Sequence, residues 1–497
     1  MAVTPAARLG LATLDRLSAE SRPLVRPGAV PTGIVHLGLG AFHRAHQAVY
    51  TEQAIAAAGG DWGIVGVAPR SAAVLSALRA QDALFSVTTL AAGASSTRVV
   101  GALSGLRHAA ADPGAVVRLL ADPAVRVVTL TVTEKGYRLD PATGRLLIDD
   151  AVCADLETDR PPGTIPGLLV RGLLARCRAD AGPIALVSCD NLPANGRRLR
   201  SMVDQALRRL DQASARSVLD WTARQVSFPG TMVDRIVPAS TPQTRSTAAA
   251  ALGVRDLAAV SAEPYSQWVV EDDFPGGRPA WELAGAVLTA DARPWERLKL
   301  RTLNGVHSAI AYLGAVAGRE TIADALEMPG LREVLRRFVA EDVAPSLRPP
   351  PGVTVVRYGE SVLERFANPA IEHRTVQVAM DGSQKLPQRV LHTVLDRRAA
   401  GGVPRWGTLV IAGWMRFVQG STDEQRPLPL DDPLAGEIRA RLAAAPRTPE
   451  GVVDALLGLR AVFPAELADD DTVRALLVEW LTALGKHGVA ATLAGTT

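Results

Sequence analysis

The hydrophobic pattern of the chain changes at about residue 286. Before that point, short apolar runs alternate with amphipathic stretches, and the runs end in glycine or polar residues. The apolar runs predict buried strands at 34–37, 62–67, 125–132 and 183–188. The amphipathic stretches predict helices at 45–58, 71–80 and 197–210. This alternation is typical of an α/β fold with a doubly wound, mostly parallel sheet.

Two further features complete the predicted layout. Residues 85–90 and 97–100 have strand-type composition and predict a hairpin inserted after the helix at 71–80. Beyond residue 286 strand patterns become rare, and helices are predicted at 294–318, 321–344, 387–399, 434–444, 449–461 and 471–485. We therefore expect two domains: an α/β domain over residues 1–286 and a mainly α-helical domain over residues 287–497.

The composition narrows the class of protein. The net charge is only +3 and no long basic run occurs, so a nucleic-acid partner is not expected. The apolar runs are too short for a membrane span, and the N-terminus lacks the apolar core of a signal peptide. The three cysteines, Cys153, Cys177 and Cys189, match neither a zinc site nor a disulfide framework. These features predict a reduced, cytoplasmic protein without a membrane partner.

The first predicted strand ends in a glycine turn that is typical of a dinucleotide site. Gly38 and Gly40 would let the backbone approach a pyrophosphate, and the helix that follows would offer N–H groups to it. His43 stands where a third glycine is usual, so packing alone would also explain the turn. His43 and His46 lack a third ligand of suitable spacing, and we expect packing or phosphate-facing roles and no metal. Cofactor contacts are expected from Gly38, Gly40, Ala41, Phe42 and Arg44.

Residues that follow the predicted strands at 62–67 and 125–132 are further candidates for binding the cofactor in the same Rossmann-type site. No ribose-binding carboxylate follows the strand at 62–67, and Arg70 stands there instead. Arg70 would face an adenosine 2′-phosphate or pack on the adenine, so we expect NAD and leave NADP open. Glu134 and Lys135 follow the strand at 125–132, at the sheet edge where ligands bind.

Polar side chains are grouped on the first helix of the second domain. At about 100° per residue, Glu296, Lys299, Asn304 and His307 share one helix face. That face would present a lysine, an amide and an imidazole to one small molecule, or it is simply a solvated surface. Asp234 lies in an apolar segment, as an ion-pair partner of Arg235 or as part of a site.

Six motifs in order resemble the long-chain polyol dehydrogenase family, which includes mannitol dehydrogenase, fructuronate reductase and tagaturonate reductase. The resemblance covers roughly residues 25–485, and its motifs lie at 38–46, 133–137, 189–196, 228–236, 299–308 and 381–387. It implies metal-free, NAD-type hydride transfer between a secondary alcohol and a ketone, in a cleft between a Rossmann-type domain and a helical substrate domain.

The resemblance also implies roles for single residues. Lys299 matches the general acid/base, Asn191 and Asn304 match amides that polarise the reacting oxygen, and His307 matches a substrate-orienting group. Such a lysine needs burial or a nearby positive charge to bring its pKa towards the working pH. Glu296 would pass protons to solvent or simply pair with Lys299.

The segment 368–385 resembles fructuronate reductases more than mannitol dehydrogenases. Arg374 and Lys385 are the nearby cations for a uronate carboxylate, and Asp234 is a third substrate-binding candidate. We expect a monomer or weak homo-oligomer that converts D-fructuronate to D-mannonate. The alternatives are a mannitol or arabinitol 2-dehydrogenase and a non-catalytic nucleotide-binding protein, which the intact set of Lys299, Asn304 and His307 disfavours.

Overall fold

The structure, a computed structural model, describes residues 7–91, 93–140 and 143–496, which form parts of two compact units. The N-terminal unit ends at Arg293 and the C-terminal unit begins at Pro294. The division falls after the expected residue 286 because β12 (Val287–Thr289) pairs with β11 (Gln267–Glu271) and so belongs to the first unit. The first six residues, on which part of the signal-peptide argument depends, lie outside the described residues.

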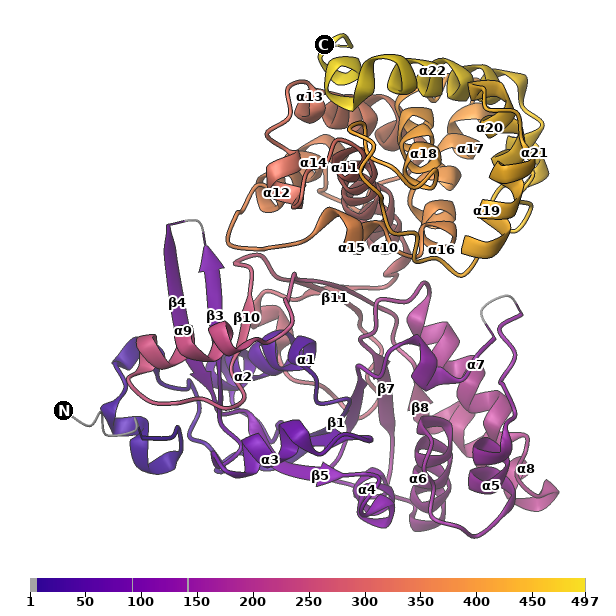
Figure 1. Cartoon of the computed structure of the whole chain (residues 1–497). Helices are drawn as coiled ribbons and strands as arrows, with labels where there is room; N and C mark the ends of the chain where they lie inside the picture. The colour runs from indigo at the N-terminus through magenta and orange to yellow at the C-terminus, as the bar shows by residue number, and fades with distance from the viewer. Residues whose placement is uncertain (1–6, 92, 141–142, 497) are drawn as a thin grey trace. The chain divides into compact units, whose positions relative to one another are not determined.

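A six-stranded parallel sheet organises the N-terminal unit (Figure 1). In the order in which they pair, its strands are β5 (Leu103–His108), β2 (Gly63–Ala68), β1 (Thr32–Leu37), β6 (Val127–Leu130), β7 (Ile184–Ser188) and β8 (Val226–Ser227). The chain runs outward from β1 in one direction and from β6 in the other. The carboxyl ends of β1 and β6 therefore form the switch point at which such sheets bind ligands.

Helices cover both faces of this sheet, as the doubly wound class requires. One face packs on α4 (Pro113–Leu120), α6 (Ile165–Ala179), α7 (Asn195–Leu207) and α8 (Gln212–Gln225). The other packs on α2 (Gln47–Ala58) and α3 (Ala73–Arg79). The strands at β1, β2, β6 and β7 confirm the four predicted apolar runs, since each is buried on both faces. Strand β5 was not predicted, because this edge strand is only partly buried and lacks an apolar run.

Two three-stranded sheets complete the unit. The predicted hairpin is confirmed as β3 (Phe85–Ala91) and β4 (Ala94–Val100), and β10 (Val260–Ala262) pairs with β3. Helix α9 (Pro242–Leu252) packs along these strands (Figure 1). Strand β9 (Thr231–Asp234) pairs with β11, which also pairs with β12.

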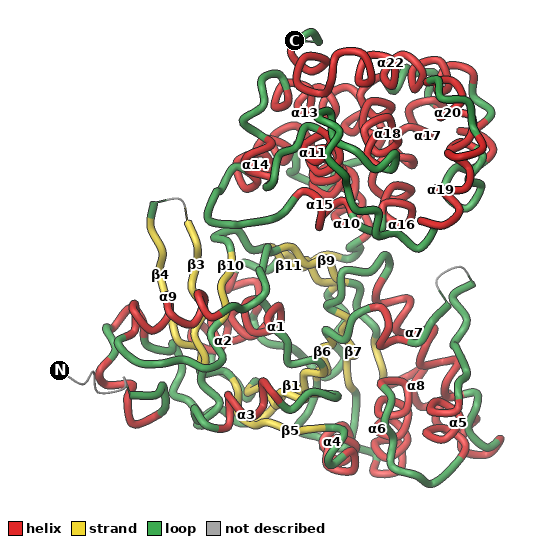
Figure 2. Tube along the Cα trace, viewed as in Figure 1, coloured by secondary structure: helices red, strands yellow, loops and turns green. Residues whose placement is uncertain are grey.

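Helices joined by loops make up the described part of the C-terminal unit (Figure 2). Its core is the pair α11 (Gly305–Val316) and α18 (Arg405–Phe417), which pack on one another. Helix α18 was not predicted, and all its residues except Arg405 are buried. Also part of the unit are α14 (Val355–Phe366), α15 (Thr375–Ala379), α16 (Gly382–Leu386), α17 (His392–Ala399), α19 (Ala435–Ala444), α20 (Pro449–Leu457) and α22 (Asp471–Ala494).

The predicted helix at 294–318 contains a change of helix type. Helix α10 (Arg293–Lys299) passes into a π-helical turn, Leu300–Asn304, which leads into α11. A π turn bonds residue i to i+5 and breaks the regular step of about 100° per residue. The π turn includes Asn304 and therefore changes the angular step used to place Lys299, Asn304 and His307 on one face, so the shared face stays a prediction.

None of the helices in the described ranges is long and apolar enough to cross a bilayer. The expected cytoplasmic location and the expected monomer or weak homo-oligomer stay predictions.

Candidate active site

The turn after β1 needs glycine at Gly38 for reasons internal to the protein. Gly38 has φ 106°, a backbone conformation that L side chains rarely adopt. A Cβ there would overlap the carbonyl oxygen of Thr131. The Gly38 N–H donates to Val67 O at 2.9 Å, and the Thr131 hydroxyl donates to Gly38 O at 2.7 Å. Gly38 thus joins β1 to its two neighbours at the switch point.

The space around Gly40 is open, whereas Gly38 is enclosed by neighbouring atoms. Gly40 is exposed, it has φ −84°, and the nearest atom to a Cβ there would be Gly38 O at 3.8 Å. Nothing within the described chain therefore requires glycine at this position. The open backbone fits the close approach of a ligand, and Ala41 and Phe42 lie beside it, half-buried.

Two stacked histidines support the turn from beneath. The buried His36 ring donates from Nε2 to Gly38 O at 3.0 Å, and Nδ1 lies 2.8 Å from the Thr129 hydroxyl. His43 stacks on His36 with ring centroids 3.4 Å apart. Burial lowers the pKa of His36 to about 3 and that of His43 well below 6.5, so both rings are neutral at neutral pH. His43 is a packing group in this arrangement.

Among the described residues, no group of three or more His, Cys, Asp or Glu side chains is placed to hold a metal ion.

The two arginines predicted to bind cofactor differ in their surroundings. Arg44 is buried, with its guanidinium donating to the carbonyl oxygens of Gly40 and Ala258, and burial lowers its pKa to about 10. Arg44 therefore bonds the turn through carbonyl oxygens, and its expected contact with the cofactor stays a prediction. Arg70 is exposed just beyond the carboxyl end of β2, and its carbonyl accepts a bond from His108.

The segment after β6 lies at the same edge of the sheet. Glu134 and Lys135 are exposed, and Glu134 pairs with Arg198 at 3.7 Å. Beneath them, Asp190 accepts from Thr133 N at 2.9 Å and Tyr137 Oη at 2.7 Å. Sequence reasoning did not assign roles to this buried pair of carboxylate and phenol. The signal available in the sequence was that Tyr137 lies in the motif at 133–137 and Asp190 in the motif at 189–196.

Asn191 is exposed directly after β7, beside Asp190. Its turn is braced by Asn195, whose side-chain N–H donates to Asp190 O at 3.1 Å and to Thr231 O at 3.0 Å. The Thr231 N–H donates back to Asn195 Oδ1 at 2.9 Å. The two motifs at 189–196 and 228–236 therefore form one bonded layer, and Asn195 is a bracing residue that sequence reasoning missed.

Asp234 and Arg235 belong to the same motif, at 228–236, and lie where β9 ends. Asp234 is buried at the end of β9. Arg235 donates to Ala45 O at 2.5 Å and to Glu263 O at 3.1 Å, so its guanidinium is engaged by backbone carbonyls.

In the C-terminal unit, the polar residues gather at the π turn. Lys299, the last residue of α10, is only 7% exposed, and Asn304, which ends the π turn, is also 7% exposed. Glu296 is half-buried one turn before Lys299. The expected alternative of a solvated surface is wrong for the lysine and the amide, because both are buried. Single π turns in helices frequently occur at functional sites.

His307 lies in the first turn of α11 and stacks on two rings. Its ring centroid is 4.5 Å from that of Phe366 and 5.6 Å from that of His373. Burial lowers its pKa well below 6.5, with smaller contributions from His373 and from three cations, Arg389, Lys385 and Arg365. The imidazole is therefore neutral at neutral pH. Within the described part of the chain, its buried Nε2 has no hydrogen-bond partner.

Three cations are candidates for binding a substrate carboxylate: Arg374 and Lys385, which were expected from the sequence, and Arg389, which was not. Arg374 is exposed at the start of α15. Lys385 donates to Met380 O at 2.5 Å and lies 3.8 Å from Asp381. Arg389 was missed, although it follows Lys385 by one helical turn.

Arg389 lies on a π-helical turn, Pro387–Leu391, and its Nη1 donates to Ser308 Oγ at 3.1 Å. Burial lowers its pKa. No carboxylate pairs with it in the described ranges of the chain. Since a half-buried cation loses part of its hydration and is stabilised by an opposite charge, this arrangement is suited to an anionic ligand.

Comparison with known proteins places this fold and site in a family. The mannitol dehydrogenase Rossmann domain matches residues 32–283, and the mannitol dehydrogenase C-terminal domain matches residues 291–484. The chain therefore belongs to the mannitol dehydrogenase family, and it is an oxidoreductase that acts on a secondary alcohol. The predicted family and the predicted fold class are both confirmed.

Relatives along the whole chain carry different substrates in their names. The D-mannonate oxidoreductase of Escherichia coli (strain K12) is 40% identical over 457 residues, which cover 90% of this chain and 92% of the relative. A substrate-free D-sorbitol dehydrogenase structure has a TM-score of 0.90 at 34% identity, covering 98% of this chain and all of that one (100%). A Pseudomonas fluorescens mannitol 2-dehydrogenase complex with NAD and D-mannitol has a TM-score of 0.83 at 31% identity, covering 98% and 99%.

Proposed function

We propose that this protein is an NAD-dependent enzyme that interconverts a ketouronate and its sugar acid, with D-fructuronate and D-mannonate as the leading pair. The observation that carries the proposal is the half-buried Arg389, which bonds Ser308 near His307 and pairs with no carboxylate in the described ranges. A guanidinium binds a carboxylate through a matching pair of N–H donors, and a neutral polyol offers no carboxylate. The 40% identity to D-mannonate oxidoreductase supports the same choice.

The residues at the switch point fit a dinucleotide. Gly38 shapes the turn, and Gly40 leaves open backbone beside it. The bound nicotinamide would supply or accept the hydride. NAD is favoured because the mannitol 2-dehydrogenase structure contains it. The exposed Arg70 keeps NADP as an alternative. Glu134 and Lys135 remain proposed nucleotide contacts.

In this proposal each polar group has one task. Lys299 Nζ moves the proton of the reacting oxygen, and the amides of Asn191 and Asn304 donate hydrogen bonds to that oxygen. The neutral His307 orients a neighbouring hydroxyl through Nε2. Asp234, Arg374 and Lys385 remain proposed substrate contacts, and Arg389 joins them as the carboxylate-binding group.

A polyol 2-dehydrogenase is the second candidate. The D-sorbitol dehydrogenase and mannitol 2-dehydrogenase structures match nearly the whole chain, which favours it. Under this alternative Arg389 would bind a hydroxyl.

The test is NADH oxidation with D-fructuronate, D-tagaturonate and D-fructose in parallel, each repeated with NADPH. Turnover with a ketouronate and little with D-fructose is the expected result. Turnover with D-fructose alone would contradict the sugar-acid proposal and favour the polyol enzyme. Nucleotide binding without turnover of any substrate would favour the non-catalytic alternative.

A further inference from the structure

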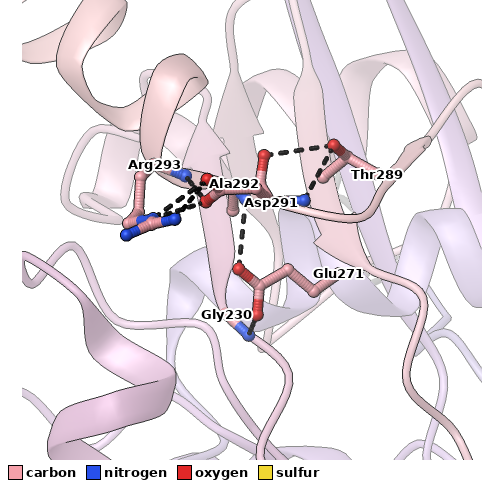
Figure 3. Close-up of polar contacts among 6 residues, drawn as sticks. All are labelled: Gly230, Glu271, Thr289, Asp291, Ala292 and Arg293. Atoms are coloured by element: carbon pink, nitrogen blue, oxygen red, sulfur yellow. Dashed lines mark hydrogen bonds and ion pairs between the residues drawn. The ribbon is translucent and has the colours of Figure 1, made fainter.

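The carboxylate of Glu271 joins two segments that lead to proposed reacting groups. Glu271 is half-buried at the end of β11. Its Oε2 accepts a hydrogen bond from Gly230 N at 2.7 Å, and its Oε1 accepts one from Ala292 N at 3.1 Å (Figure 3). Each carboxylate oxygen therefore engages the backbone of a different segment. Charge-assisted bonds of this kind are stronger and shorter than neutral ones.

On the first side, Gly230 belongs to the loop before β9. The next residue, Thr231, exchanges hydrogen bonds with the side chain of Asn195, which braces the turn that carries Asn191. The Gly230 carbonyl also accepts from Glu271 N at 2.9 Å, and a Cβ at Gly230 would lie 2.9 Å from Glu271 Oε2. This close double contact fixes the loop against Glu271.

On the second side, Ala292 directly precedes α10, and Lys299 is the last residue of that helix. Asp291 accepts from Arg293 N at 2.9 Å and pairs with the Arg293 guanidinium at 2.7 Å. The Thr289 hydroxyl donates to Asp291 O at 3.1 Å (Figure 3). The lead-in to α10 is thus a compact, bonded segment, and Glu271 ties it down at Ala292.

We propose that Glu271 is a positioning residue for the reaction: it fixes both the residue that precedes α10 and the loop that braces the turn carrying Asn191. The inference rests on the proposed roles of Asn191 and Lys299. Ala292 directly precedes α10, whose seven residues end at Lys299, so loss of the bond at Ala292 loosens the start of the helix that carries the lysine. Misplacement of a reacting group by about 1 Å can cost about a hundredfold in rate.

Glu271→Gln and Glu271→Ala test this inference with whichever substrate the wild type turns over. Gln keeps one acceptor oxygen, and Ala keeps none. We expect kcat to fall about tenfold or more in Glu271→Ala and less in Glu271→Gln. The dissociation constant of NADH, measured by fluorescence titration, should change less than kcat does, since Glu271 bonds Gly230 and Ala292 and neither turn glycine. With 4-deuterated NADH, the isotope effect on kcat should rise as hydride transfer becomes slower than product release.

The matched control is Asp272→Asn. Asp272 is the next residue in the chain, and its carboxylate pairs with Arg278 at 2.6 Å. This variant loses one ion pair in the same unit and should keep the wild-type kcat and isotope effect.

A wild-type kcat in both Glu271 variants would overturn the inference, and a lowered melting temperature in those variants would then mark Glu271 as purely structural. A fall in kcat without any rise in the isotope effect would overturn it as well. Turnover of a polyol and no ketouronate would contradict the proposed substrate, and the Glu271 test would proceed unchanged with that polyol.

Discussion

Arg389 and Ser308 are bonded side chain to side chain, although 81 positions separate them in the chain, with Nη1 lying 3.1 Å from Oγ. Ser308 follows His307, so this bond ties Arg389 to the helical turn that carries the imidazole. The positive charge of Arg389 also contributes to the lowered pKa of His307. The neutral imidazole and the permanent cation therefore offer different chemistry to one ligand: a hydroxyl partner and a carboxylate partner.

Replacement of Arg389 by Gln should weaken the use of a ketouronate specifically. We expect kcat/KM for the ketouronate to fall by about tenfold to a hundredfold, the value of a charged hydrogen bond, and kcat/KM for a ketose to change less. Arg357→Gln, at an exposed position on α14, is the control and should keep both values. A large loss in Arg374→Gln with none in Arg389→Gln would restore the assignment made from sequence.

Replacement of Lys299 by Ala should abolish turnover and spare nucleotide binding. General acid/base groups contribute about a hundredfold to ten-thousandfold, so kcat should fall by at least about a hundredfold. Fluorescence titration with NADH separates the two effects. Full activity in this variant would contradict the proposed role of the lysine.

His307→Asn should raise KM and leave the pH profile in place. Because the pKa of His307 lies well below 6.5, the imidazole is neutral on both sides of pH 6.5 and does not titrate there. KM should rise about tenfold, since one hydrogen bond to substrate is lost. The measurement is kcat/KM against pH for both proteins. Disappearance of a wild-type ionisation in the variant would show that His307 itself titrates.

The two turn glycines should respond differently to Ala. Gly38→Ala places a Cβ against Thr131 O at φ 106° and should destabilise the fold, with a lower melting temperature. Gly40→Ala meets nothing closer than 3.8 Å and should keep the wild-type melting temperature. It should nevertheless bind NADH about tenfold more weakly, because a methyl group would stand where the nucleotide approaches. Unchanged NADH affinity in Gly40→Ala would contradict the proposed nucleotide site.

His36 should make the N-terminal unit sensitive to acid. Below pH 6.5 the unfolded chain protonates this histidine, and the folded protein does not until about pH 3. Unfolding therefore takes up a proton, and this group's contribution to stability falls as the pH falls, by about 1.4 kcal/mol per pH unit in that window. Urea unfolding at several pH values should show a shallower pH dependence for His36→Gln than for the wild type. Equal slopes in both proteins would contradict this prediction.

The sequence by itself determined the parts whose signals are local. Strands β1, β2, β6 and β7 are buried on both faces, so each is a continuous apolar run that can be recognised without its neighbours. Gly38 and the order of the six motifs likewise stand in the sequence, and they sufficed for the family and the fold class.

Only the tertiary structure decided which polar groups meet. The π turn at Leu300–Asn304 changes the helical step between Lys299 and His307, and nothing in the local pattern marks it. Long-range packing buries Arg44 and bonds its guanidinium to Ala258 O, far along the chain. Arg389 reaches Ser308 from far along the chain. These positions depend on the packing of distant segments, and hydrophobic periodicity carries no information about such pairings.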